Sequence, residues 1–71
     1  MKKGDKVRCR VKDPYGVGDK QFSRRILTVG DYAHNDKNYV WVSWKNMWDG
    51  RMERFGNWID VNMLVPRWRS H

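Results

Sequence analysis

Polar and apolar residues alternate strictly near the start of the chain, over residues 6–12. Val7, Cys9 and Val11 fall on one side of an extended backbone, and the side chains between them are all basic. Because successive side chains of a strand point to opposite faces, this period of two predicts a half-buried strand with a basic outer face. The basic positions of that face are Lys6, Arg8, Arg10 and Lys12.

The rest of the chain repeats strand patterns, and helical periodicity is absent. Residues 13–23 are dense in turn-forming residues and predict an irregular loop, and the polar segment 33–38 predicts a turn. Further strands are predicted at 24–29, at 39–48, from residue 51 onward, and after a short turn within 60–66. We therefore expect one all-β domain over residues 1–71, with five short strands and a basic C-terminal tail at 67–71.

The dipeptide Asp49-Gly50 separates two of these strands and predicts a two-residue hairpin, because both positions tolerate positive φ. A turn of this length pairs Trp48 with Arg51 and fixes every following pair by counting outward. One face then collects a core set: Val40, Val42, Trp44, Phe55 and Ile59. The opposite face collects Trp41, Trp58, Lys45, Arg54, Met47 and Met52. A four-residue loop in place of the tight turn would shift this register.

The second face of this hairpin carries a functional signal. Lys45 stands opposite Arg54, and like charges across a strand pair are unfavourable unless solvent or an anion relieves them. Trp41 stands opposite Trp58 beside that pair, and aromatic rings next to paired cations suit a base stacked over a bound phosphate. In the alternative interpretation, the C-terminal tail covers Trp58 and the two cations point into water.

The charge balance supports an anionic partner. Fifteen Lys and Arg residues against eight Asp and Glu give a net charge of +7 and a pI near 10. Such an excess attracts polyanions, with nucleic acid first and an anionic membrane or an acidic protein face after it. The alternative is a cationic surface without a dedicated anion site.

The single cysteine, Cys9, excludes an internal disulfide, and only two histidines, His34 and His71, accompany it. Structural zinc is therefore not expected, and Cys9 is interpreted as a buried, reduced thiol in a cytoplasmic protein. The chain has no apolar run of membrane-spanning length, and no hydrophobic stretch follows its basic start, so we expect neither a membrane span nor an export signal.

The order of these segments resembles SH3-like barrels, in particular KOW-type and Tudor-type domains, and is similar to short bacterial and phage proteins. The resemblance is carried by Gly4-Asp5-Lys6-Val7, Leu27-Thr28-Val29, Val40-Trp41-Val42-Ser43-Trp44 and Leu64-Val65-Pro66. It implies a small five-stranded barrel. It also implies binding roles, because KOW-type barrels bind nucleic acid or ribosomal and transcription components, and Tudor-type barrels bind methylated side chains.

No set of residues predicts catalysis. The serines lack a nucleophile motif, and most of the acidic residues adjoin turn-forming positions, where their ordinary role is turn formation and solvation. We expect a non-enzyme without a cofactor.

Two functions are left open. The favoured one is a nucleic-acid-binding module for DNA or RNA, in which phosphate contacts give affinity with little sequence preference. The alternative is a protein-interaction module, such as an adaptor or a phage-encoded inhibitor that docks on an acidic host protein. Membrane binding ranks last, and the chain is expected to be a monomer or a homodimer. The candidate binding residues are Arg8, Arg10, Lys12, Arg24, Arg25, Trp41, Lys45, Arg54 and Trp58.

Overall fold

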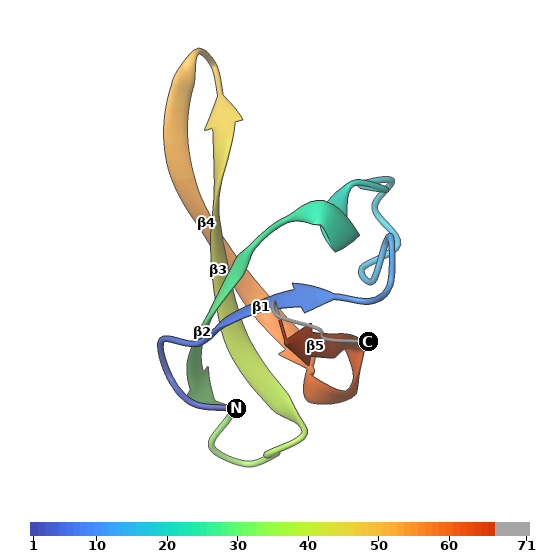
Figure 1. The fold of residues 1–71 in the computed structure, drawn as a ribbon, viewed down its shortest axis with the longest axis vertical. Helices are drawn as coiled ribbons and strands as arrows, with labels where there is room; N and C mark the ends of the chain where they lie inside the picture. Colours follow the sequence, from blue (N-terminus) through green and yellow to red (C-terminus); the bar gives the residue numbers. More distant parts are fainter. Residues whose placement is uncertain (67–71) are drawn as a thin grey trace.

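The computed structural model describes residues 1–66, which form five antiparallel strands in one sheet of order β4-β3-β2-β1-β5. The strands are β1 (Lys6–Cys9), β2 (Leu27–Tyr32), β3 (Tyr39–Trp48), β4 (Arg51–Asp60) and β5 (Leu64–Pro66) (Figure 1). Two short 3-10 turns, η1 (Phe22–Arg24) and η2 (Val61–Met63), precede β2 and β5. The predicted all-β class with five strands is confirmed, and the basic tail predicted at 67–71 lies outside the described residues.

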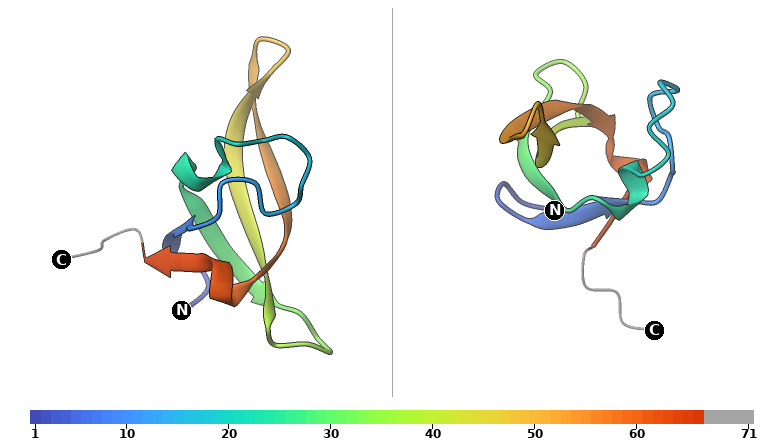
Figure 2. Two further views of the ribbon diagram at one scale, coloured as in Figure 1. Left: turned by 90° about the vertical axis from the view of Figure 1, so that its right-hand side faces the viewer. Right: turned by 90° about the horizontal axis from the view of Figure 1, so that it is seen from above.

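The sheet curls strongly, so that its strands follow a ring-like path when seen from above (Figure 2). β4 and β5 stand at the two ends of the strand order, and within residues 1–66 no pairing joins them. η2 turns the chain from β4 directly into the three-residue β5, which pairs with β1. The sheet is therefore an open curl that is not closed into a barrel.

The first strand is shorter than its alternating sequence predicts. β1 ends at Cys9, whereas the pattern continues to Lys12. The backbone N–H of Arg10 donates to the carbonyl oxygen of Met63 in η2 at 2.8 Å. This bond continues the pairing with β5 by one residue past Cys9. The last two basic residues of the pattern, Arg10 and Lys12, therefore lie beyond the end of β1.

The second strand begins later and ends later than predicted. β2 starts at Leu27 instead of Arg24, because the preceding residues form η1 and bury the side chain of Phe22. At its other end β2 continues to Tyr32, with a register shift against β3 between Val29 and Tyr32. Burial of one aromatic side chain thus outweighs the β propensity of the residues that follow it.

The β3–β4 hairpin has the predicted register at every pair, from Trp48 with Arg51 at the turn to Val40 with Ile59. Asp49 and Gly50 have φ angles of 53° and 74°, as a tight turn of this kind requires. Because the two strands pair along their full ten residues, the hairpin extends beyond the rest of the sheet (Figure 1).

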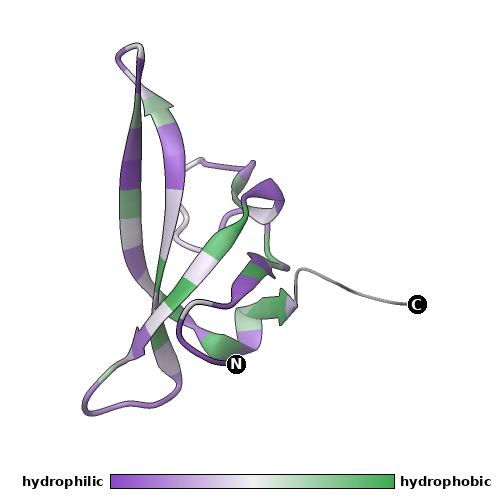
Figure 3. Ribbon diagram, turned by 60° about the vertical axis from the view of Figure 1, so that its left-hand side comes forward, coloured by the Kyte–Doolittle hydropathy of each residue, from purple (hydrophilic) through white to green (hydrophobic). Residues whose placement is uncertain are grey.

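The hydrophobic core combines inward-facing residues of all five strands with one residue of η1. These positions alternate with polar ones, which produces the banded hydropathy along the strands in Figure 3. In the core set predicted for the hairpin, three residues are buried, whereas Trp44 and Phe55 are only half-buried. The buried residues are Val7, Cys9, Phe22, Leu27, Val29, Val40, Val42, Ile59 and Leu64.

Two aromatic side chains from outside the strands complete this core. Phe22 packs edge-to-face against Trp44, with ring centroids 4.9 Å apart, and against Tyr15 at 5.5 Å. The Tyr15 hydroxyl donates to the backbone carbonyl of Trp58 at 2.9 Å, which ties the long first loop to β4. Burial raises the pKa of Tyr15 to about 12, because the charged phenolate is poorly solvated there.

Candidate nucleic-acid interface

The outer face of the hairpin presents three successive cross-strand pairs. They are Trp41 with Trp58, Ser43 with Gly56, and Lys45 with Arg54. Residues two apart on a strand share a face, so the tryptophans and the cations lie on the same side of the sheet, as the register predicts. Trp41 and Lys45 are four positions apart, which corresponds to about 13 Å along the strand.

Trp41 and Trp58 form an aromatic pair, which we call the tryptophan platform. Their ring centroids are 5.3 Å apart with an interplanar angle of 76°, an edge-to-face arrangement. Trp41 is 37% exposed and Trp58 is 44% exposed, so both rings keep surface that a ligand can reach. The alternative in which the C-terminal tail covers Trp58 concerns residues outside the described part of the chain.

Two glycines make room for Trp41 on the neighbouring strands. A Cβ placed on Gly56 of β4 would lie within 3 Å of three indole atoms, and one on Gly30 of β2 would lie 3.1 Å from Cδ1 of the indole. The indole therefore rests against backbone that carries no side chain. This close approach places Trp41 over the strand that carries its partner, Trp58.

A cationic depression, which we call the basic groove, opens where β2 and η1 diverge from the extended hairpin. Its lining comes from five elements: β1, η1, β2 and both strands of the β3–β4 hairpin. The lining contains five basic side chains and no carboxylate. Its residues are Lys6, Gln21, Arg24, Arg25, Ile26, Thr28, Trp44, Lys45 and Arg54.

Hydroxyl groups orient two of these cations. Lys6 donates from Nζ to Oγ1 of Thr28 at 2.8 Å. Arg54 donates from one terminal guanidinium nitrogen to Oγ of Ser43 at 3.0 Å. An ammonium has three donors and a guanidinium five, so each cation keeps free donors after these contacts.

Arg25 occupies a different environment from the other groove cations. Its side chain is 20% exposed and forms an ion pair with Asp19 at 3.1 Å. Its Nε is buried without a hydrogen-bond partner. Within residues 1–66 the other four groove cations form no ion pair. They therefore carry the unneutralised positive charge of the groove, whereas Arg25 contributes mainly to its shape.

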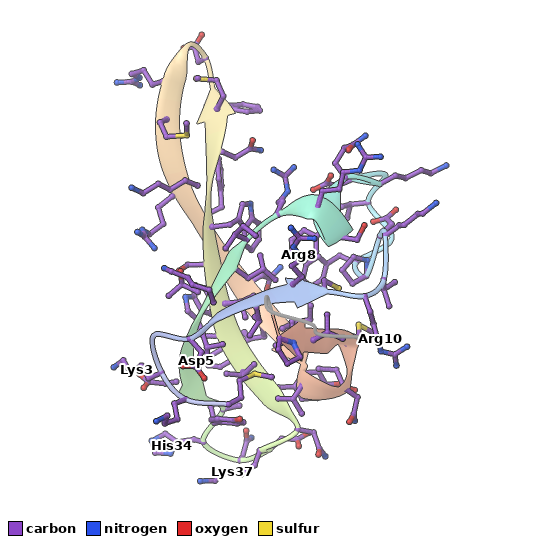
Figure 4. All side chains as sticks on the ribbon, in the orientation of Figure 1. Lys3, Asp5, Arg8, Arg10, His34 and Lys37 are labelled. Carbon is purple, nitrogen blue, oxygen red and sulfur yellow. The ribbon has the colours of Figure 1, made fainter. Side chains whose placement is uncertain are left out.

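The basic residues of the first strand do not stay together. Arg8 remains exposed on the same face of β1 as Lys6. Arg10 lies beyond the end of β1, where its Nε donates to the backbone carbonyl of Asn62 at 2.8 Å, and Figure 4 shows it apart from Arg8. Lys12 follows in the first loop. Of this trio, only Arg8 adjoins the groove residue Lys6 along a strand.

The structure thus brings together four of the predicted residues in the basic groove and two in the tryptophan platform. The predicted set missed the cation Lys6 and the two hydroxyl residues that orient cations, Thr28 and Ser43. The alternating pattern of the first strand places Lys6 on the basic face, and the hairpin register places Ser43 on the face of Lys45 and Arg54. Thr28 needed the pairing of β2 with β3, which places it opposite Ser43.

This face offers cations and accessible indoles, which can bind through charge and stacking. The thiol of Cys9 is buried, and burial raises its pKa, so the nucleophilic thiolate is disfavoured. Residues 1–66 contain no group of three or more His, Cys, Asp or Glu side chains that could hold a metal ion. Among the same residues, no helix has the length and apolarity needed to span a membrane.

Comparison of the chain with family models, with curated proteins and with solved structures found no match.

Proposed function

We propose that this protein is a non-catalytic nucleic-acid-binding module. One observation carries the proposal: a groove with five basic side chains shares a sheet face with two accessible tryptophans. Within residues 1–66 four of the five cations have no carboxylate partner, so they are available to bind phosphates, and accessible indoles stack on bases. Either feature alone is common on protein surfaces, whereas both on one hairpin face allow a single strand to place its backbone phosphates in the groove and its bases on the tryptophan platform.

The chemistry of the groove favours phosphate over a general acidic surface. Arg54 and Lys6 are each fixed by a hydroxyl, which reduces the side-chain entropy lost on binding. Charge-assisted hydrogen bonds from guanidinium to phosphate are among the stronger polar contacts in proteins. We expect Lys45 and Arg54 to contact phosphate, with the tryptophan platform about 13 Å along the strand stacking on bases.

The test is a titration of intrinsic tryptophan fluorescence with single-stranded and double-stranded oligonucleotides at several salt concentrations. We expect saturable quenching and a logarithm of the binding constant that falls linearly with the logarithm of salt concentration. Arg54→Ala and Lys45→Ala are each expected to weaken binding and to lower the salt slope by about 0.7–0.9. Absence of binding at low salt would refute the proposal.

A matched control comes from the same chain. Lys12→Ala removes the same charge as Lys45→Ala, but Lys12 is an exposed loop residue beyond the end of β1 and outside the groove lining. We expect Lys12→Ala to change the affinity less than Lys45→Ala. Equal effects of the two variants would indicate a diffuse cationic surface instead of a groove.

A second candidate function rests on the hairpin tip. Met47, Trp48 and Met52 are 58%, 65% and 61% exposed, and such residues are enriched in protein interfaces. A protein partner bound through this tip would be retained at salt concentrations that release a nucleic acid. Trp48→Ala should abolish such an interaction and leave oligonucleotide binding nearly unchanged.

A further inference from the structure

A second depression lies at the base of the hairpin, beside the loop that carries His34 and Lys37 (Figure 4). Three partly exposed aromatic side chains line it: Tyr32, Tyr39 and Trp58. We call it the aromatic depression. Trp58 belongs to both this depression and the tryptophan platform, so the depression continues the proposed interface at the end away from the hairpin tip.

The aromatic depression differs from the basic groove in charge. Asp31 and Asp36 line it, and no lysine or arginine does. An ionised carboxylate only accepts hydrogen bonds and repels phosphate, so the two carboxylates favour a group that offers N–H or O–H donors. His34 and Asn35 also line the depression and can donate hydrogen bonds to other atoms of such a group. Flat aromatic walls add a preference for a planar group.

Asp36 is the better placed of the two carboxylates. Asp31 pairs with Lys3 at 3.3 Å, whereas Asp36 forms no ion pair within residues 1–66. Oδ1 of Asp36 accepts the backbone N–H of Asn38 at 3.0 Å, and its carbonyl oxygen accepts that of Tyr39 at 3.1 Å. The turn thus holds this carboxylate beside an aromatic wall, and Oδ2 makes no hydrogen bond within the described residues.

We propose that the aromatic depression binds one unstacked guanine base of a bound strand. This inference rests on the proposed function. The Watson–Crick edge of guanine carries two adjacent donors, N1–H and the N2 amino group, which match the two oxygens of one carboxylate. Thymine and uracil present a single N–H flanked by two carbonyl oxygens, which a carboxylate repels. Since the base must leave its stack and expose this edge, single strands are favoured over duplexes.

The experiment compares two short single-stranded ligands, oligothymidine and the same oligothymidine with one central guanine. We expect the guanine strand to bind about tenfold more tightly, the discrimination typical of one bidentate side-chain–base pair. Asp36→Asn keeps an oxygen for the Asn38 N–H but replaces an acceptor with a donor. It is expected to remove the guanine preference, which is measured as the ratio of the affinities for the two strands.

Two further variants separate the site from its surroundings. Asp31→Asn removes the same charge from the residue that Lys3 already pairs, and it should retain most of the preference. Tyr39→Ala removes one wall and should weaken guanine-strand binding about tenfold. A thermal melt of each variant followed by circular dichroism shows that it is folded.

The outcomes distinguish the two proposals. Equal affinity of the wild-type protein for both strands overturns the guanine site and leaves nucleic-acid binding standing. A guanine preference that survives Asp36→Asn also overturns the assignment to this depression. Failure to bind either strand at low salt overturns the proposed function, and the guanine site with it.

Discussion

Replacing Gly56 with alanine tests whether the tryptophan platform depends on the bare backbone beneath Trp41. A Cβ at Gly56 would lie within 3 Å of three indole atoms. Favourable carbon–carbon contacts lie at about 3.5–4.0 Å, so the overlap is too large to be absorbed in place. Gly56 is held by its pairing with Ser43, and we expect the indole to swing away from β4.

The magnitude follows from the area that the indole loses. Trp41 is 37% exposed, so nearly two-thirds of its side chain is covered. For a side chain of about 250 Å², half of the covered area is about 80 Å², which is worth about 2 kcal/mol of unfolding free energy. In a domain of this size, that loss lowers Tm by about 8–16 °C.

The assay is thermal unfolding by circular dichroism of four proteins: wild type, Gly56→Ala, Trp41→Ala and the double variant. With Trp41 removed, the added methyl meets no indole, and we expect Gly56→Ala to be neutral or slightly stabilising in that background. The same loss of Tm in both backgrounds would refute the reasoning. It would show that the cost arises in the β4 backbone and not from the indole.

Three further changes test the packing of the fold. Tyr15→Phe removes the bond to the Trp58 carbonyl and should cost about 1 kcal/mol in urea unfolding. The pKa of Tyr15, about 12 when folded against 10 for the free group, means that its neutral form stabilises the fold fully below pH 10. This contribution is lost as pH rises from 10 to 12, and a Phe variant with the same alkaline decline would contradict that account. Alanine is strained at the positive φ of 53° that Asp49 adopts, so Asp49→Ala should lower the free energy of unfolding by about 1 kcal/mol in thermal melts. Asparagine tolerates this φ, so Asp49→Asn should stay within a few tenths of a kcal/mol of wild type. Equal losses in the two variants would show that the φ at this position does not determine the cost. Phe22→Ala should cost about 3–5 kcal/mol by denaturant titration, and a loss below 1 kcal/mol would mean that η1 is not part of the core.

The hairpin could be predicted pair by pair because its determinants are local. Asp49-Gly50 selects the turn, the turn sets the register, and a period of two assigns the faces. Counting outward from the turn was sufficient to place four residues on one face: Trp41, Trp58, Lys45 and Arg54. No contact distant in the sequence was needed.

The basic groove and the first loop could not be derived in this way. Among residues 1–66, Phe22 is the only core residue outside a strand, and its burial places Arg24 in η1 and delays the start of β2. The groove exists because this turn diverges from the hairpin, so Lys6 and Arg24 meet Lys45 only after the tertiary fold forms. The local β propensity of these segments does not indicate that their side chains come close together in the folded protein.

The hydrogen bonds of Trp58 bear on the solubility of a sheet that stays open. β4 is the outermost strand on its side, and unpaired main-chain groups of such a strand can template the addition of another chain and lead to aggregates. At Trp58 the backbone N–H donates to the Asn57 side chain at 2.8 Å, and the carbonyl accepts from Tyr15 at 2.9 Å. Both main-chain groups of Trp58 already form hydrogen bonds, so another strand cannot pair with β4 at this position. Arg51, Glu53 and Arg54 place charge along the rest of this border. The loop that carries Tyr15 therefore protects the edge of β4 against pairing with other chains, in addition to covering the core.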